Sequence, residues 1–136
     1  MNRTILMLEH DEDDRYITQT IFGENHPNIS LAFVHDSLDL TKHLETCIVK
    51  GTMLPLLILL DYHASPLSAV EILKTLKSDK RFNHIPVIVL SGTVHPDIIK
   101  DCYAHGASSF IQKPSAGVEN KISTFIRYWF EVVELI

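Results

Sequence analysis

The sequence has few cysteines and no long apolar run, and its acidic residues outnumber its basic ones. Its only two cysteines, Cys47 and Cys102, stand far apart in helical patterns, so we expect two buried free thiols rather than a disulfide. No apolar stretch approaches the ~20 residues that span a bilayer, and the N-terminus lacks the apolar core of a secretory signal. The 12 Lys and Arg against 17 Asp and Glu give a net charge of -5. We therefore expect a cytoplasmic protein that binds neither nucleic acid nor membrane.

Hydrophobic residues make up 46% of the 136 residues, which is enough for one domain with a sizeable core. We find no repeat, low-complexity tract or linker. A single domain is expected over residues 1–136, with no separate output domain.

Short apolar runs alternate with helical patterns five times along the chain. The expected strands are 3–8, 29–34, 56–60, 86–90 and 107–111. The expected helices run from the acidic residues 11–14 to near Gly23, from the capping pair Asp36 and Ser37 to at least Ile48, and over 67–78, 96–105 and 117–135. This alternation predicts an α/β fold, a doubly wound five-stranded parallel sheet with helices on both faces.

Polar side chains follow four of the apolar runs at the point where each strand ends. Asp61 follows 54–60, Glu9 and His10 follow 5–8, Ser91 and Gly92 follow 87–90, and Lys113 follows 108–111. In open parallel sheets, chemistry gathers at the carboxyl ends of strands. Each residue alone has an ordinary role, as a turn former, a solvated helix start or a surface lysine. Together they predict a site for a phosphoryl group.

These residues resemble the receiver domains of two-component response regulators, the CheY-like superfamily. The resemblance covers about residues 2–130 and is most specific at 104–114 (Ala-His-Gly-Ala-Ser-Ser-Phe-Ile-Gln-Lys-Pro). Residues 85–87 (Ile-Pro-Val) and 128–130 (Tyr-Trp-Phe) make the chain most similar to small stand-alone response regulators of the phytochrome-associated type. The resemblance implies a flavodoxin-like (βα)5 fold with strand order 2-1-3-4-5.

The resemblance also implies a role for each matching position. These roles are phosphoacceptor for Asp61; phosphoryl binding for Ser91, Gly92 and Lys113; switch aromatic for Phe110; metal binding for Glu9, His10, Asp61 and the backbone carbonyl of His63; and a cis peptide bond before Pro114. It implies a Mg²⁺ cofactor and a phosphoryl group taken from a sensor histidine kinase or phosphotransfer protein. The signal would pass to a downstream protein target. A homodimer through the face made of helix four, strand five and helix five is a further possibility. The domain is expected to signal and not to be an enzyme, beyond its own phosphorylation and dephosphorylation.

His10 departs from the family pattern, because it stands where an aspartate usually contacts the metal. Imidazole is a poor ligand for Mg²⁺ and a better one for transition metals. A register shift that uses Asp11 instead is an alternative. The loop 62–66 and Ala69 also depart from the pattern.

Two hypotheses follow for the cation, and two for the function. The site binds Mn²⁺ or Zn²⁺ through His10 and His63, or both imidazoles point to solvent and Mg²⁺ binding is weakened. The alternative function is a phosphorylation-impaired, receiver-like adaptor that acts by protein contacts. A flavodoxin-like small-molecule binder would need a glycine-rich loop after the first strand, and residues 9–14 contain no glycine.

Overall fold

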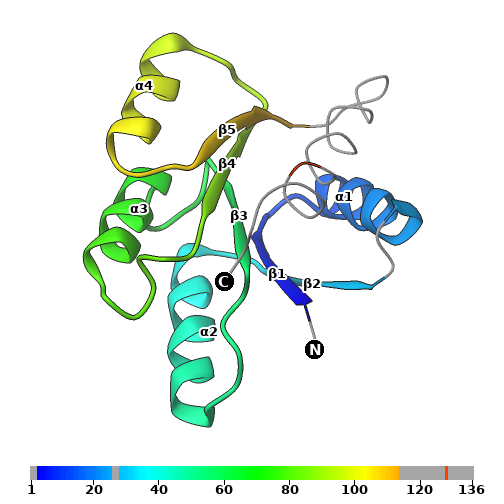
Figure 1. The fold of residues 1–136 in the computed structure, drawn as a ribbon. Coiled ribbons are helices and arrows are strands. Elements are labelled where there is room, and N and C mark those ends of the chain that lie inside the picture. Colours follow the sequence, from blue (N-terminus) through cyan, green and yellow to red (C-terminus); the bar gives the residue numbers. More distant parts are fainter. Residues whose placement is uncertain (1–2, 26–27, 114–127, 129–136) are drawn as a thin grey trace.

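Five strands form one parallel sheet in the computed structural model, which describes residues 3–25, 28–113 and 128. The strands are β1 (Arg3–Leu8), β2 (Ile29–Val34), β3 (Leu57–Asp61), β4 (Val87–Ser91) and β5 (Ser109–Gln112). They pair in parallel in the order β2-β1-β3-β4-β5 (Figure 1). The predicted α/β fold class and the strand order 2-1-3-4-5 are confirmed.

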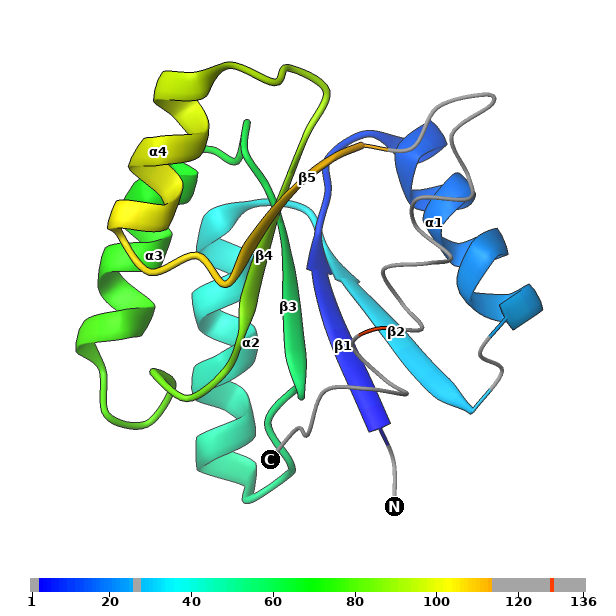
Figure 2. The same cartoon turned by 45° about the horizontal axis from the view of Figure 1, so that its top comes forward.

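Within the described residues, four helices cover the two faces of the sheet. They are α1 (Glu12–Asn25), α2 (Ser37–Lys50), α3 (Ala69–Ser78) and α4 (Pro96–Ala104). Figure 2 shows α1 on one face and the other three helices on the opposite face. Side chains alternate between the faces along each strand. Leu6 and Leu60 therefore pack with Ile72 of α3, whereas Met7 and Leu59 pack with Phe22 of α1.

Local capping signals set several helix ends. The Asp36 side chain accepts a hydrogen bond from the Asp39 amide and caps α2. Gly51 ends α2 with a positive φ of 67°, which glycine adopts at no steric cost. Ser68 and Glu71 form a reciprocal capping box, so α3 begins at Ala69 and not at the predicted residue 67.

The other differences from the predicted boundaries are small and have local causes. The helix predicted to end near Gly23 continues to Asn25, because Gly23 does not adopt the positive φ that stops a helix. β3 and β4 each end one residue later than predicted, at Asp61 and Ser91. The strand predicted over 107–111 is displaced to Ser109–Gln112.

Some predictions fall on residues that the structure does not describe. These are the helix over 117–135 and the cis peptide bond before Pro114. In the described part of the chain, the peptide bond between Ser65 and Pro66 is cis. Cys47 and Cys102 are both free and buried, as predicted. None of the helices in the described ranges is long and apolar enough to cross a membrane.

Candidate functional site

The ends of β1, β3, β4 and β5 bring the predicted site residues to one edge of the sheet. Backbone hydrogen bonds extend the pairing just beyond the strands. The Glu9 amide donates to the Val34 carbonyl (3.2 Å), and the Lys113 amide donates to the Ser91 carbonyl (2.9 Å). The backbone of each end is therefore fixed, and the side chains of Glu9, Asp61 and Lys113 meet in front of the sheet.

Asp61 presents a fully buried carboxylate at the end of β3. Its Oδ1 accepts a hydrogen bond from the His63 amide at 3.0 Å. Its Oδ2 lies 2.8 Å from Nδ1 of His10. Because an ionised carboxylate only accepts, the ring nitrogen is the donor in this bond. Both oxygens of Asp61 are thus engaged by groups that stabilise its charge.

Lys113 brings an ammonium group from the end of β5 into contact with three carboxylates. Its Nζ lies 2.8 Å from Glu9 Oε1, 3.1 Å from Asp14 Oδ2 and 3.4 Å from Asp61 Oδ2. It donates hydrogen bonds to Glu9 and Asp14. The lysine is therefore held mainly by Glu9 and Asp14, and its contact with Asp61 is the longest of the three.

The two buried carboxyl groups have opposite shifts in pKa. Burial raises the pKa of Glu9 from its ordinary value near 4.5 to about 7, against the opposing effect of the bond from Lys113. Burial also tends to raise the pKa of Asp61, but hydrogen bonds with Glu9 and with the His63 amide outweigh it and the pKa is lowered. Burial tends to lower the pKa of Lys113, and its bond with Glu9 and the charge of Asp61 reverse this and raise it. Asp61 is accordingly the anionic member of the pair.

Several known proteins resemble this chain in sequence over part of its length, although no family model matches it. The two-component response regulator ARR16 of Arabidopsis thaliana is 35% identical over 78 residues, which are 56% of this chain and 46% of that protein. ARR17 of the same plant is 38% identical over 58 residues, which are 43% of this chain and 38% of that protein. The matched segments thus span less than half of either relative.

Solved structures match the fold over nearly the whole chain. The phosphorylated cyanobacterial phytochrome response regulator RcpA superposes with a TM-score of 0.89 at 22% identity, covering 99% of both chains. The Mn²⁺-bound form of response regulator Rcp1 superposes with a TM-score of 0.88 at 22% identity, covering 98% of this chain and 99% of that one. The chain therefore has the fold of response regulator receiver domains. The predicted resemblance is confirmed.

Three residues that were predicted to bind or sense a phosphoryl group lie around the ends of β4 and β5. The buried Ser91 hydroxyl donates to the Thr93 carbonyl at 2.7 Å and accepts from the Thr93 amide at 3.0 Å. A side chain at Gly92 would meet nothing within 4 Å, so the space beside it is open. Phe110 is half-buried against the core. In this structure the hydroxyl of Ser91 is therefore bonded within its own turn.

The two histidines beside Asp61 differ from each other. The expectation that both imidazoles point to solvent is wrong for His10, whose Nδ1 is bonded to Asp61, even though its side chain is 61% exposed. The exposed His63 ring packs edge-on to Tyr62, with the ring centroids 5.3 Å apart. Asp11 does not join the carboxylates, because its Oδ1 accepts from the Asp14 amide at the start of α1. The alternative register that used Asp11 is thus not adopted.

Two further residues contact the predicted site, and sequence reasoning missed them. Asp14 was interpreted as part of a solvated helix start, but it is a partner of Lys113. The Tyr103 hydroxyl accepts a hydrogen bond from the Phe110 amide at 3.1 Å and ties α4 to β5. The acidic run 11–14 indicated that an acid near the site was available. Which acid of the run contacts Lys113 depends on how α1 docks on the sheet.

The sheet edge offers a suitable donor set for a divalent cation. Glu9, His10 and Asp61 each supply one ligand atom, and these atoms all lie within 4.8 Å of one another. Two of the three donors are carboxylates, which suit Mg²⁺, and the third is an imidazole, which does not. The residues present therefore fit a divalent cation. Which cation they prefer depends on His10, the nitrogen donor of the set.

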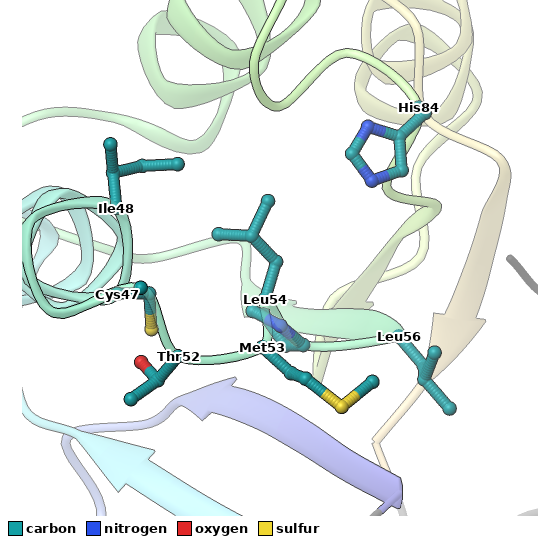
Figure 3. A pocket seen from close by; sticks show the side chains of 9 residues that line it. Cys47, Ile48, Thr52, Met53, Leu54, Leu56 and His84 are labelled. Carbon is teal, nitrogen blue, oxygen red and sulfur yellow. The ribbon is translucent and has the colours of Figure 1, made fainter.

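A separate pocket of about 380 Å³ lies away from this site. Figure 3 shows it between the end of α2, the segment leading into β3, and His84. Its lining includes Cys47, Leu54 and Leu56. Because it borders the start of β3, at the other end of that strand from Asp61, it is not part of the candidate site.

Proposed function

We propose that the domain is a stand-alone response regulator that accepts a phosphoryl group on Asp61. The observation that carries the proposal is the buried, anionic Asp61 carboxylate with the ammonium of Lys113 beside it. A carboxylate nucleophile requires a negative charge, and a transferring phosphoryl group requires nearby positive charge. One edge of the sheet supplies both.

The proposed donor is a phosphohistidine of a sensor histidine kinase or of a phosphotransfer protein. An Asp61 oxygen attacks phosphorus, the O–P bond forms as the P–N bond breaks, and the released imidazole takes up a proton. The product is an acyl phosphate. Lys113 offsets charge on the phosphoryl oxygens throughout the transfer. The domain is thus a phosphoacceptor and not an enzyme with a separate substrate.

Four groups would hold a divalent cation, for which the family resemblance implies Mg²⁺: Glu9, His10, Asp61 and the His63 backbone carbonyl. Such an ion supplies further positive charge to the transferring oxygens. The buried Glu9 also holds Lys113 in place through its hydrogen bond.

The proposed signal is a population shift between two packings of the domain. The Ser91 hydroxyl would exchange its bonds with Thr93 for a bond to the phosphoryl group, and Phe110 would turn inward. Tyr103 bonds the backbone of Phe110, so movement there would reach α4. The reshaped surface would be recognised by a downstream protein or by a second copy of the chain.

The test is to incubate the protein with acetyl phosphate and Mg²⁺ and to weigh it intact. We expect the mass to increase by one phosphoryl group, and Asp61→Asn to show no increase. Glu24→Gln is a matched control, because this exposed carboxyl on α1 is remote from the sheet edge. Equal mass gain in the parent and in Asp61→Asn would refute the assignment of the phosphoacceptor.

One observation favours a second candidate, an adaptor that works without phosphorylation. His10 is bonded to the Asp61 oxygen that also faces Lys113, so the nucleophile is covered on that side. If this bond blocks the reaction, the parent gains no mass and His10→Asp gains it. A mass gain in both proteins would exclude the adaptor reading.

A further inference from the structure

His10 places a ring nitrogen against the two buried carboxylates of the site. Its Nδ1 lies 2.8 Å from Asp61 Oδ2 and 3.7 Å from Glu9 Oε2. The His10 side chain is 61% exposed, whereas those of Glu9 and Asp61 have no exposed surface. The imidazole thus lies between the carboxylates and solvent, with a nitrogen directed at them.

The spacing of these atoms suits a small divalent ion and is compatible with tetrahedral coordination. Ligand atoms about 2.1 Å from Zn²⁺ lie about 3.4 Å from one another in a tetrahedron. The two distances from His10 Nδ1 fall on either side of that value, and one ligand atom from each residue lies within 4.8 Å of the others. Three protein ligands would leave one position for water or for a phosphoryl oxygen.

The charges around Glu9 also favour a cation at this position. Its Oε1 is buried and accepts no hydrogen bond, although Lys113 Nζ lies 2.8 Å away and donates to Oε2. One ammonium therefore serves two fully buried carboxylates. Two buried carboxyl groups that share one ammonium leave an excess of negative charge when both are ionised, and a further cation would offset it.

The chemistry of the third donor discriminates between cations. Mg²⁺ demands oxygen ligands in a near-ideal octahedron, whereas imidazole suits Zn²⁺ and its neighbours in the transition series. We infer that this site selects a transition cation of the Zn²⁺ class over Mg²⁺, with His10 Nδ1 as its third protein ligand. The role of the bound ion rests on the proposed function, because the ion would lie beside the phosphoryl group on Asp61.

Binding of the ion changes the state of His10 in a defined way. In the metal-free protein Nδ1 carries a proton and donates it to Asp61 in a hydrogen bond. A metal takes the lone pair of Nδ1, so that proton leaves and the neutral ring carries its proton on Nε2. The exposed ring can exchange protons with water, and the Asp61 oxygen is released from the hydrogen bond.

The experiment compares metal affinities of the unphosphorylated full chain. Zn²⁺ affinity is measured by competition with a chromophoric chelator, Mg²⁺ affinity by calorimetry, and Co²⁺ binding by its visible d–d absorption. We expect Zn²⁺ to bind more tightly than Mg²⁺, and His10→Ala to weaken Zn²⁺ and Co²⁺ binding by at least about tenfold. His10→Asp is expected to reverse the preference towards Mg²⁺. His84→Ala removes an exposed histidine at the other end of the domain and is the matched control.

The outcomes separate this inference from the proposed function. Tighter Mg²⁺ than Zn²⁺ binding by the parent, or equal Zn²⁺ affinity in the parent and His10→Ala, would overturn the inference. Equal losses in His10→Ala and His84→Ala would also overturn it, because the ion would then bind elsewhere. No phosphoryl donor is present in these measurements. A failure of acetyl phosphate to modify Asp61 therefore leaves the metal result intact, and the reverse also holds.

Discussion

Replacing Glu9 with glutamine should remove a pH-dependent loss of stability. The side chain of Glu9 is fully buried, and burial raises its pKa from near 4.5 to about 7. Glutamine has nearly the same shape as the protonated acid and does not titrate. The variant therefore keeps the packing and removes the ionisation.

The sign follows from the protons bound in each state. Below pH 4.5 the carboxyl is protonated in both the folded and the unfolded chain. The contribution of Glu9 to the free energy of unfolding is then fully present. Between pH 4.5 and about 7 the unfolded chain releases the proton while the folded chain keeps it. Stability therefore falls as pH rises through this window. Asp61 does not interfere, because its pKa is lowered below the ordinary 3.8 and it stays ionised.

The size of the effect follows from the shift of about 2.5 units between 4.5 and about 7. At about 1.4 kcal/mol per unit, the contribution of Glu9 falls by at most roughly 3 kcal/mol across the window. Coupling to Asp61 and relaxation of the site reduce this, so we expect roughly 1 to 3 kcal/mol.

Urea unfolding of the parent and of Glu9→Gln, measured at intervals from pH 4.5 to pH 7.5, is the assay. The difference between the two free energies of unfolding should change steadily in favour of the variant as pH rises. Glu24→Gln, which removes an exposed carboxyl from α1, should follow the parent at every pH. Parallel curves for the parent and Glu9→Gln would refute the raised pKa and the reasoning built on it.

Three other predictions follow from the same structure. Lys113→Met leaves the carboxylates of Glu9 and Asp61 without their ammonium, so at pH 8 we expect urea unfolding to show a loss of about 3 kcal/mol or more. Divalent cation affinity, measured by calorimetry, should be about tenfold weaker at pH 6 than at pH 8, because Glu9 must lose its proton to bind. Gly106→Ala should lower stability by about 1 kcal/mol or more and by more than Gly51→Ala in thermal unfolding. Both glycines have positive φ, but only the Cβ at Gly106 would meet an α3 side-chain carbon, at 2.7 Å.

Each of these predictions has a result that contradicts it. A loss below 1 kcal/mol in Lys113→Met would mean that the carboxylates do not depend on the ammonium. Equal cation affinity at pH 6 and pH 8 would exclude the protonated form of Glu9. Equal effects of the two glycine variants would mean that the α3 side chain moves aside without cost.

The fold could be predicted from the sequence because its signals are local. The apolar run that ends at Asp61, the capping residues at Asp36 and the acids after β1 each act within a few neighbouring residues. Alternation of strands and helices then leaves few topologies. For this reason the parallel sheet and the convergence of Glu9, Asp61 and Lys113 at its edge could be predicted from the residues, whereas the strand order came from the family resemblance.

The details of the site could not be predicted, because they depend on side chains from distant segments. Asp14 reaches Lys113 across 99 positions of sequence, and this contact depends on how α1 docks on the sheet. His10 had two plausible directions, and the choice depended on the position of Asp61, 51 residues away. The boundary error at Gly23 has a different origin, since a glycine ends a helix only where the following chain requires a positive φ.

The balance of charge at the sheet edge explains why His10 affects both proposals, phosphorylation of Asp61 and metal binding. Glu9, Asp61 and Asp14 surround a single ammonium, so the metal-free site has more negative than positive charge. Burial and the neighbouring Asp61 raise the pKa of Glu9 to about 7, which favours a proton on Glu9 in the metal-free site, and His10 donates a hydrogen bond to Asp61. A bound divalent ion would displace that proton and that hydrogen bond together. Metal binding and exposure of the Asp61 nucleophile are then one equilibrium, and a substitution at His10 should change both in the same protein.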